Sequence, residues 1–291
     1  MKILVLGASG MLGSAVYRVF SERADWKVFG AVRSPDVINL FPSKLAAGLV
    51  IGCDVTDHSA LEALMAQTRP DVVINCVALG KGSPHAGEPL QTLELLSILP
   101  QRLARLCRLA DARLVHISSD GVFSGSKGGY IEDDLPDATD LYGVAKFLGE
   151  VQDAQTITLR TSIIGHELQT RHGLVGWFLA QEQSCKCFTR AIFSGFPVVV
   201  LAMIIRDVIL PRPELSGIYH VAAQAVSKFD LLSLVAEIYG KSIEIVPDER
   251  VSIDRSLNAE RFRKETGYIA PDWRELVTQM HYYQKLQEEA R

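Results

Sequence analysis

The chain of 291 residues lacks the features that would place a protein in a membrane or on nucleic acid. Its longest apolar run, residues 196–205, ends at Arg206 and is too short to cross a bilayer. Its net charge of -4 comes without any basic run, so electrostatics do not favour nucleic acid. An apolar strand expected from Lys2 leaves no room for a signal peptide. We therefore expect a cytoplasmic protein that binds neither nucleic acid nor membrane.

The chain also lacks the cysteine and histidine spacings of disulfide and metal proteins. Its five cysteines form no C-x-x-C pair and no even framework, which is typical of buried or incidental thiols in a reducing compartment. Cys185 and Cys187 have no further ligand nearby and the histidines are scattered, so we predict no metal site. The motif G-x-S-x-G is absent, which argues against a serine hydrolase.

What the chain does have is a glycine-rich turn directly after its first apolar run. Residues 2–6 predict a strand buried on both faces, and a helical pattern begins beyond Gly13. Between them, Gly7 permits a tight turn and Gly10 lets a pyrophosphate approach the backbone, while Gly13 lets the helix pack against the strand. The free N–H groups of the helix would then face the phosphates. This arrangement predicts a dinucleotide site, although such glycines can also serve the turn alone.

The end of the second predicted strand indicates which dinucleotide is bound. Residues 27–32 predict this strand, and Arg33 follows it at the place where an acidic residue would bind the ribose of NAD. An arginine there accommodates the 2′-phosphate instead, so we expect NADP(H) rather than NAD(H); the alternative is a solvated arginine. Asp54, after a third strand at 49–53, either binds the adenine amino group or caps a helix, and Asp57 caps the helix 59–68.

Strands and helices then alternate along most of the chain. The pattern predicts strands at 71–76, 113–118, 156–162, 217–222 and 243–246, and helices at 89–110, 174–183, 200–210, 229–239 and 258–290, the last broken at Pro271. This order predicts an α/β fold, a Rossmann-type doubly wound parallel sheet with a smaller C-terminal α/β substrate-binding region. We expect residues 1–165, joined by 196–225, to form the NADP-binding domain. Residues 166–195 and 226–291 would bind the substrate.

Three polar side chains are predicted to meet at the carboxyl edge of this sheet. Tyr142 and Lys146 are four residues apart on a predicted helix, so they share one face. A neighbouring ammonium would lower the pKa of a tyrosine and fit it for proton transfer to a carbonyl or alcohol oxygen. Ser119, at the end of the fifth strand, could polarise the same oxygen. The alternative is a surface tyrosine and lysine without a shared role.

In this combination the chain resembles the extended short-chain dehydrogenase/reductases, and within them the dTDP-4-dehydrorhamnose reductase-like branch. The resemblance rests on GASGMLG (7–13), ISSDGVFSG (117–125), YGVAK (142–146), LRTSIIG (159–165), GIYHVA (217–222) and DRSLN (254–258). It implies NADPH-dependent reduction of the 4-keto group of a nucleotide-linked 6-deoxyhexose, with Ser119, Tyr142 and Lys146 as the catalytic residues. The sugar would be of the dTDP-4-dehydrorhamnose type or of the UDP-2-acetamido-2,6-dideoxy-4-ketohexose type. The product would serve surface polysaccharide synthesis.

The resemblance also implies two sets of binding residues. The cofactor set is Gly7, Ser9, Gly10, Met11, Leu12, Gly13, Arg33, Asp54, Val55, Cys76, Val77, Ala78, Ile117, Tyr142, Lys146 and Thr161. The substrate set is Lys81, Ser119, Gly121, Val122, Phe123, Ile163 and Arg255, of which Lys81 and Arg255 could equally be solvated charges. Three positions depart from the branch: Gly121 stands where relatives often have tyrosine, Ile163 where tryptophan is common, and Leu96 where many have asparagine.

Two other functions stay open. The same branch includes a non-catalytic regulatory subunit, a partner of methionine adenosyltransferase that keeps the fold. A nucleotide-sugar epimerase is the other alternative, although Arg33 is basic where epimerases usually carry an acidic residue. A 4,6-dehydratase is disfavoured because Asp120 is followed by Gly121, not by a second acid. The expected partner is a nucleotide-sugar substrate, and a homodimer is compatible with the sequence.

Overall fold

The centre of the molecule is a seven-stranded sheet in which every neighbouring pair of strands is parallel. The computed structural model describes residues 1–79 and 88–289. The strands lie in the order β10-β6-β5-β4-β1-β2-β3. Their bounds are β1 (Lys2–Leu6), β2 (Lys27–Val32), β3 (Leu49–Ile51), β4 (Val72–Asn75), β5 (Arg113–Ile117), β6 (Thr156–Arg160) and β10 (Gly217–His220). The predicted doubly wound parallel sheet is confirmed.

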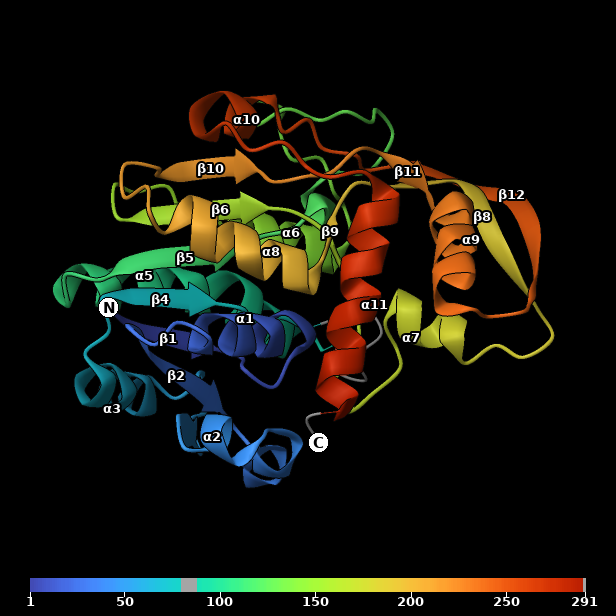
Figure 1. The fold of residues 1–291 in the computed structure, drawn as a ribbon. Helices are drawn as coiled ribbons and strands as arrows, with labels where there is room; N and C mark the ends of the chain where they lie inside the picture. Colours follow the sequence, from blue (N-terminus) through green and yellow to red (C-terminus); the bar gives the residue numbers. More distant parts are fainter. Residues whose placement is uncertain (80–87, 290–291) are drawn as a thin grey trace.

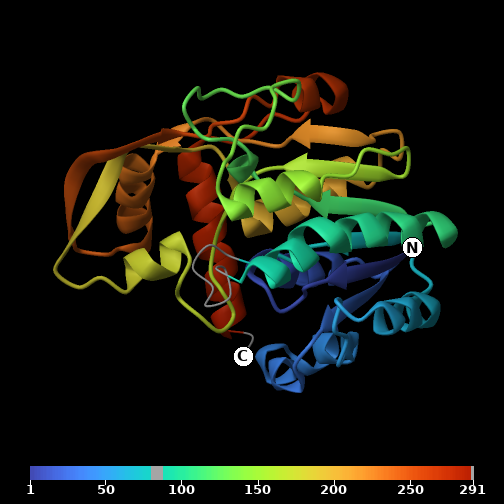
Figure 2. The same ribbon diagram turned by 180° about the vertical axis from the view of Figure 1, so that it is seen from behind.

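Helices cover both faces of this sheet because successive side chains of each strand face opposite sides. Ile3 and Val5 of β1 enter one core, whereas Leu4 and Leu6 enter the other. The first core is closed by α1 (Met11–Ser21), α8 (Val198–Ile204) and α11 (Trp273–Glu289). The second is closed by α3 (His58–Thr68), α5 (Leu99–Leu109) and α6 (Leu141–Leu148). Figure 1 shows α1 and α8 in front of the sheet, and Figure 2 shows the opposite face.

The helix expected over 89–110 is interrupted by one wider turn. It consists of α4 (Pro89–Leu93), a π-helical turn (Glu94–Ile98) and α5. Pro100 explains the interruption, since it has no N–H to donate to the Leu96 carbonyl four residues earlier. The widened turn lies directly against the end of α6, where a Cβ on Gly149 would collide with the Leu96 carbonyl.

A second, three-stranded sheet was largely missed by the sequence patterns. It has the order β11-β8-β12, with β8 (Ser184–Phe193) parallel to β12 (Glu244–Asp254) and antiparallel to β11 (Val226–Ser227). No strand was expected at β8, and only residues 243–246 of β12 were expected. The charged residues Asp248, Glu249 and Arg250 hide the pattern where the register of β12 against β8 shifts. Helix α9 (Lys228–Tyr239) packs on β8 and ends at Gly240, as predicted.

The chain passes between the two sheets three times, from β6 to β8, from β8 to β10 and from β10 to β11. The short strands β7 (Ile163–Ile164) and β9 (Phe196–Pro197) pair with each other, and after them α8 and β10 join the large sheet layer. The remaining elements are α2 (Ser43–Ala46), α7 (Leu174–Leu179), α10 (Glu260–Thr266), a second π-helical turn (Ile205–Ile209) and two 3-10 turns (Pro35–Leu40 and Asp120–Val122). Helix α11 packs on both α8 and α9, so the C-terminal tail contacts both layers. The division into a cofactor domain and a substrate region stays a prediction. In the described part of the chain, no helix combines the length and apolar character needed to cross a bilayer.

Candidate active site

The turn between β1 and α1 has the shape that a pyrophosphate requires. Gly7 has φ +73°, a left-handed conformation that favours glycine. A Cβ on Gly13 would lie 2.7 Å from the Gly7 carbonyl carbon, so only glycine permits this close packing of helix on strand. Gly10 caps α1 without any side-chain hydrogen bond, and Ser9, Gly10 and Met11 all reach the surface. The first N–H groups of α1 are therefore available to an anion, whereas the side chain of Leu12 is buried.

Arg33 and Asp54 lie near each other beyond the ends of β2 and β3. Arg33 is exposed directly after β2, where it is free to meet a phosphate group. The Asp54 carboxylate accepts hydrogen bonds from the Thr56 N–H at 3.0 Å and the Thr56 hydroxyl at 2.7 Å. These bonds, and more weakly the charge of Arg33, lower the pKa of Asp54. Asp54 thus caps a turn, Asp57 caps α3 as expected, and Val55 between them is half-buried.

The end of β4 forms the other wall of the glycine turn. The Val77 N–H donates to the Asn75 side-chain oxygen at 3.2 Å, and a Cβ on Gly7 would lie 3.1 Å from the Val77 nitrogen. Cys76 and Val77 are half-buried, and Ala78 is exposed. The segment directly after β4 therefore lies at the same sheet edge as the glycine turn. It contains three residues of the predicted cofactor set: Cys76, Val77 and Ala78.

Ser119, Tyr142 and Lys146 converge where β5 meets α6. Ser119 follows the end of β5, and its hydroxyl is a hydrogen-bond partner of the Tyr142 phenol. Lys146 lies one turn further along α6, with its Nζ donating to the Ile117 carbonyl at 2.7 Å. Asp140 caps α6 by accepting from the Gly143 N–H at 3.1 Å. The structure thus brings the three predicted side chains together, and their catalytic role stays a prediction.

The electrostatics of the site differ from the expectation that Lys146 lowers the Tyr142 pKa. Burial is the largest effect on Tyr142 and raises the pKa of its phenol, while the hydrogen bond from Ser119 acts in the opposite direction. Burial also lowers the pKa of Lys146 from 10.5 to about 8. The ammonium lies against the Ile117 carbonyl, so its charge is not directed at the phenol. Tyr142 is therefore a protonated acid at neutral pH.

A family model described as "RmlD substrate binding domain" matches residues 1–285. The chain belongs to this family. Methionine adenosyltransferase 2 subunit beta of Xenopus laevis is 25% identical to this RmlD-family chain over 264 residues, which are 82% of the chain and 72% of that protein. The dTDP-4-dehydrorhamnose reductase of Mycolicibacterium smegmatis is 32% identical over 151 residues, 51% of the chain and 40% of that protein. The expected family is thereby confirmed.

Solved structures show the same fold. The dTDP-4-dehydrorhamnose reductase from Bacillus anthracis, solved in complex with NADP, is similar with a TM-score of 0.79. It is 21% identical, and the similarity covers 97% of this RmlD-family chain and 99% of the other. At this identity the likeness establishes the fold alone.

Several predicted substrate residues of the RmlD-family chain surround Tyr142, but not all can contact a ligand through their side chains. Gly121 touches the phenol ring, since a Cβ there would lie 2.9 Å from the Tyr142 Cε1 and 3.1 Å from the Ser119 hydroxyl. Val122 and Phe123 are 0% exposed and pack with Tyr130, so their side chains belong to the core and only their backbone could reach a substrate. The sequence alone did not distinguish these roles.

The remaining predicted residues lie around the same sheet edge. Arg255 donates from Nε to the Phe123 carbonyl at 2.7 Å, and its charge favours a lower pKa of Tyr142. Ile163 is half-buried in β7, and Thr161 is buried just after β6. Ile117 contributes the carbonyl that holds Lys146. Lys81 lies outside the described residues.

Sequence reasoning missed a buried ion pair below these groups. Glu150 and Arg160 approach to 2.8 Å, and their side chains are only 2% and 3% exposed. The same carboxylate accepts from the Ser118 hydroxyl at 2.8 Å. An arginine at the end of an otherwise uncharged buried strand was the available signal, because such a charge requires a partner.

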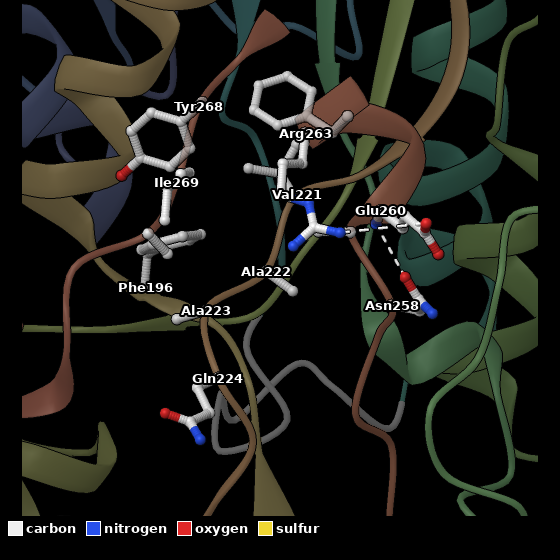
Figure 3. A pocket seen from close by; sticks show the side chains of 13 residues that line it. Phe196, Val221, Ala222, Ala223, Gln224, Asn258, Glu260, Arg263, Tyr268 and Ile269 are labelled. Atoms are coloured by element: carbon white, nitrogen blue, oxygen red, sulfur yellow. Dashed lines mark hydrogen bonds and ion pairs between the residues drawn. The ribbon is translucent and has the colours of Figure 1, made fainter. Parts of the chain in front are cut away.

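A separate cavity of about 390 Å³ lies beyond the end of β10. Phe196, Tyr268 and Ile269 form its apolar side, and Asn258, Glu260 and Arg263 face them across it, as Figure 3 shows. Its lining includes none of Ser119, Tyr142 and Lys146. Among its lining groups, burial raises the pKa of Tyr268 to about 12, and the hydrogen bond with Lys264 lowers the pKa of Glu260. Neither shift fits its group for proton transfer near pH 7, in contrast to the convergence of Ser119, Tyr142 and Lys146.

Proposed function

We propose that this chain is an NADPH-dependent reductase of the 4-keto group of a nucleotide-linked 6-deoxyhexose. The observation that carries the proposal is the meeting of Ser119, Tyr142 and Lys146 at the sheet edge that also holds the glycine turn. The match to the RmlD family and the names of the reductase relatives support the substrate class. Both the dTDP-4-dehydrorhamnose type and the UDP-2-acetamido-2,6-dideoxy type remain within the proposal.

The residues of the chain suit the binding of NADP(H). The glycine turn would hold the pyrophosphate, Arg33 the 2′-phosphate, and Lys146 the nicotinamide ribose hydroxyls. The preference for NADPH rests on Arg33, and the NADP complex of the Bacillus anthracis reductase agrees with it. When bound, the dinucleotide supplies the hydride for the reduction.

The protein side chains would carry the proton transfer and the charge stabilisation. Tyr142 donates the proton of its phenol to the oxygen of the sugar ketone as negative charge develops there. Its raised pKa keeps that proton in place near neutral pH, which suits the direction of reduction. The Ser119 hydroxyl, which accepts from the Gly121 N–H at 2.9 Å, is held where it can donate to the same oxygen.

A panel of nucleotide-linked ketosugars tests the proposal. The purified chain is mixed with NADPH and dTDP- or UDP-linked 4-keto-6-deoxyhexoses, and the absorbance of NADPH is followed. We expect turnover with at least one sugar, its loss in Tyr142→Phe, and its retention in Tyr282→Phe, a matched change at an exposed tyrosine of α11. Isomerised sugar without consumption of NADPH would indicate an epimerase instead.

A second candidate function is that of a non-catalytic regulatory subunit. It is favoured by the similarity to methionine adenosyltransferase 2 subunit beta, which extends over 82% of the chain. NADPH binding without turnover on any panel member, together with a stable complex with a methionine adenosyltransferase, would support it. The homodimer, the cytoplasmic location and the role in surface polysaccharide synthesis stay predictions.

A further inference from the structure

Helix α6 depends on other segments of the chain for its position. It spans only Leu141–Leu148, and helices this short are marginal in water by themselves. It nevertheless carries both Tyr142 and Lys146, one turn apart on the same face. Any shift of α6 along its axis therefore moves both groups relative to Ser119.

The N-terminal end of α6 is fixed by the turn that follows β5. Asp140 accepts from the Gly143 N–H at 3.1 Å, and a Cβ on Gly143 would collide with the Gly121 carbonyl. The start of the helix is therefore in direct contact with the turn that begins at Ser119.

The C-terminal end of α6 rests on the π-helical turn Glu94–Ile98. The buried Ser97 hydroxyl of this turn donates to the Ala145 carbonyl at 2.8 Å. The backbone of the same turn also lies against Gly149, where a Cβ would collide with it. Since Ala145 directly precedes Lys146, the bond from Ser97 holds the helix next to the lysine.

The need to satisfy buried polar groups does not explain a serine at this place. The Ala145 carbonyl also accepts from the Gly149 N–H at 3.1 Å, so it would keep a partner if residue 97 were alanine. An alanine would also bring no hydroxyl that needs a partner of its own. The bond from Ser97 instead acts by its direction, because it joins the turn to α6 at one fixed point.

We infer that Ser97 is a positioning residue for the reaction proposed above, because its hydroxyl sets the place of α6 and hence of Tyr142 and Lys146. This inference rests on the proposed function. With α6 held at both ends, the Lys146 ammonium stays on the Ile117 carbonyl and the Tyr142 ring stays against Gly121.

The test compares two variants that each remove one buried hydroxyl from the same helical segment, Ser97→Ala and Thr92→Val. The Thr92 hydroxyl has no hydrogen-bond partner among the described residues, whereas the Ser97 hydroxyl bonds α6. The assay follows NADPH consumption with a sugar that the unmodified chain reduces, and the stoichiometry of NADPH binding gives the fraction of intact sites.

We expect kcat per bound NADPH to fall about tenfold in Ser97→Ala with little change in KM, as for a catalytic group displaced by less than about 1 Å. Thr92→Val should leave kcat unchanged. Ser97→Cys keeps a similar volume but donates more weakly, so its kcat should lie between those of serine and alanine. This variant also serves if Ser97→Ala does not fold.

A double change separates positioning from general loosening. If Ser97 acts through Tyr142, then Ser97→Ala should lower the residual kcat of the Tyr142→Phe protein by a smaller factor than it lowers the kcat of the unmodified chain. General loosening would lower both by the same factor.

The outcomes are distinct. A folded Ser97→Ala or Ser97→Cys protein with the unmodified kcat overturns the inference. An equal fall in Thr92→Val, or an undiminished fall in the Tyr142→Phe background, overturns it as well. Absence of turnover by the unmodified chain on every nucleotide-linked ketosugar contradicts the proposed function itself.

Discussion

Replacing Lys146 by methionine should make the protein more stable at neutral pH and inactive. Lys146 is 2% exposed, and burial lowers the pKa of its amine from 10.5 to about 8. Each pH unit between two such values corresponds to about 1.4 kcal/mol, so the charged form is disfavoured in the folded state by about 3 kcal/mol. Methionine has a similar length and carries no charge into the core.

The stability gained by Lys146→Met should depend on pH, in a direction that follows from the lowered pKa of Lys146. Between pH 8 and 10.5 the unfolded chain still binds the lysine proton while the folded chain has released it. Stability of the unmodified protein therefore rises with pH in this window. The advantage of Lys146→Met should be full below about pH 8 and should fade as the pH approaches 10.5. The lost hydrogen bond to Ile117 lowers the variant's stability by a constant amount, since a neutral amine also donates.

Denaturant unfolding followed by tryptophan fluorescence measures the difference in stability between the variant and the unmodified protein. The measurements run from about pH 7 to about pH 10, across most of the range between the folded and unfolded pKa values of Lys146. Lys44→Met, at an exposed lysine of α2, is the matched control and should show no pH-dependent difference. A difference between Lys146→Met and the unmodified chain that stays constant from pH 7 to 10 would refute the reasoning. Such a result would mean that burial does not lower the pKa of Lys146.

Three further predictions concern the reacting groups and the cofactor turn. Tyr142→Phe should lower kcat by roughly 10² to 10⁴ with little change in NADPH affinity, and near-normal turnover would remove Tyr142 from the role of acid. Arg33→Asp should exchange the preference for NADPH for one for NADH, measured as the ratio of the two KM values; an unchanged ratio would reject its role. Gly13→Ala places a Cβ 2.7 Å from the Gly7 carbonyl carbon, so it should abolish NADPH binding and cost about 1 to 3 kcal/mol of stability. A folded Gly13→Ala protein with normal affinity would contradict the proposed fit.

The features that sequence reasoning found are those set by local chemistry. A run of apolar residues followed by Gly7, Gly10 and Gly13 specifies a strand, a turn and a helix within fourteen residues. Asp57 caps α3 and Gly240 ends α9 because each acts on its own backbone.

Other features depended on contacts between distant segments. Strand β8 alternates buried Cys185 and Cys187 with exposed Lys186, but its pairing with β12, some sixty residues later, leaves no local mark. The burial of the Val122 and Phe123 side chains escaped the sequence analysis for a similar reason. Tyr130 and Leu257 enclose them, and Leu257 comes from the far end of the chain.

The sequence by itself determined the parallel sheet, the glycine turn and the shared face of Tyr142 and Lys146, because period and spacing act over a few residues. Only the tertiary structure decided what surrounds those groups. The direction in which a pKa shifts depends on burial and on groups that distant segments bring together. The buried pair of Glu150 and Arg160 likewise forms only when the chain folds Glu150 against Ser118 and Arg160.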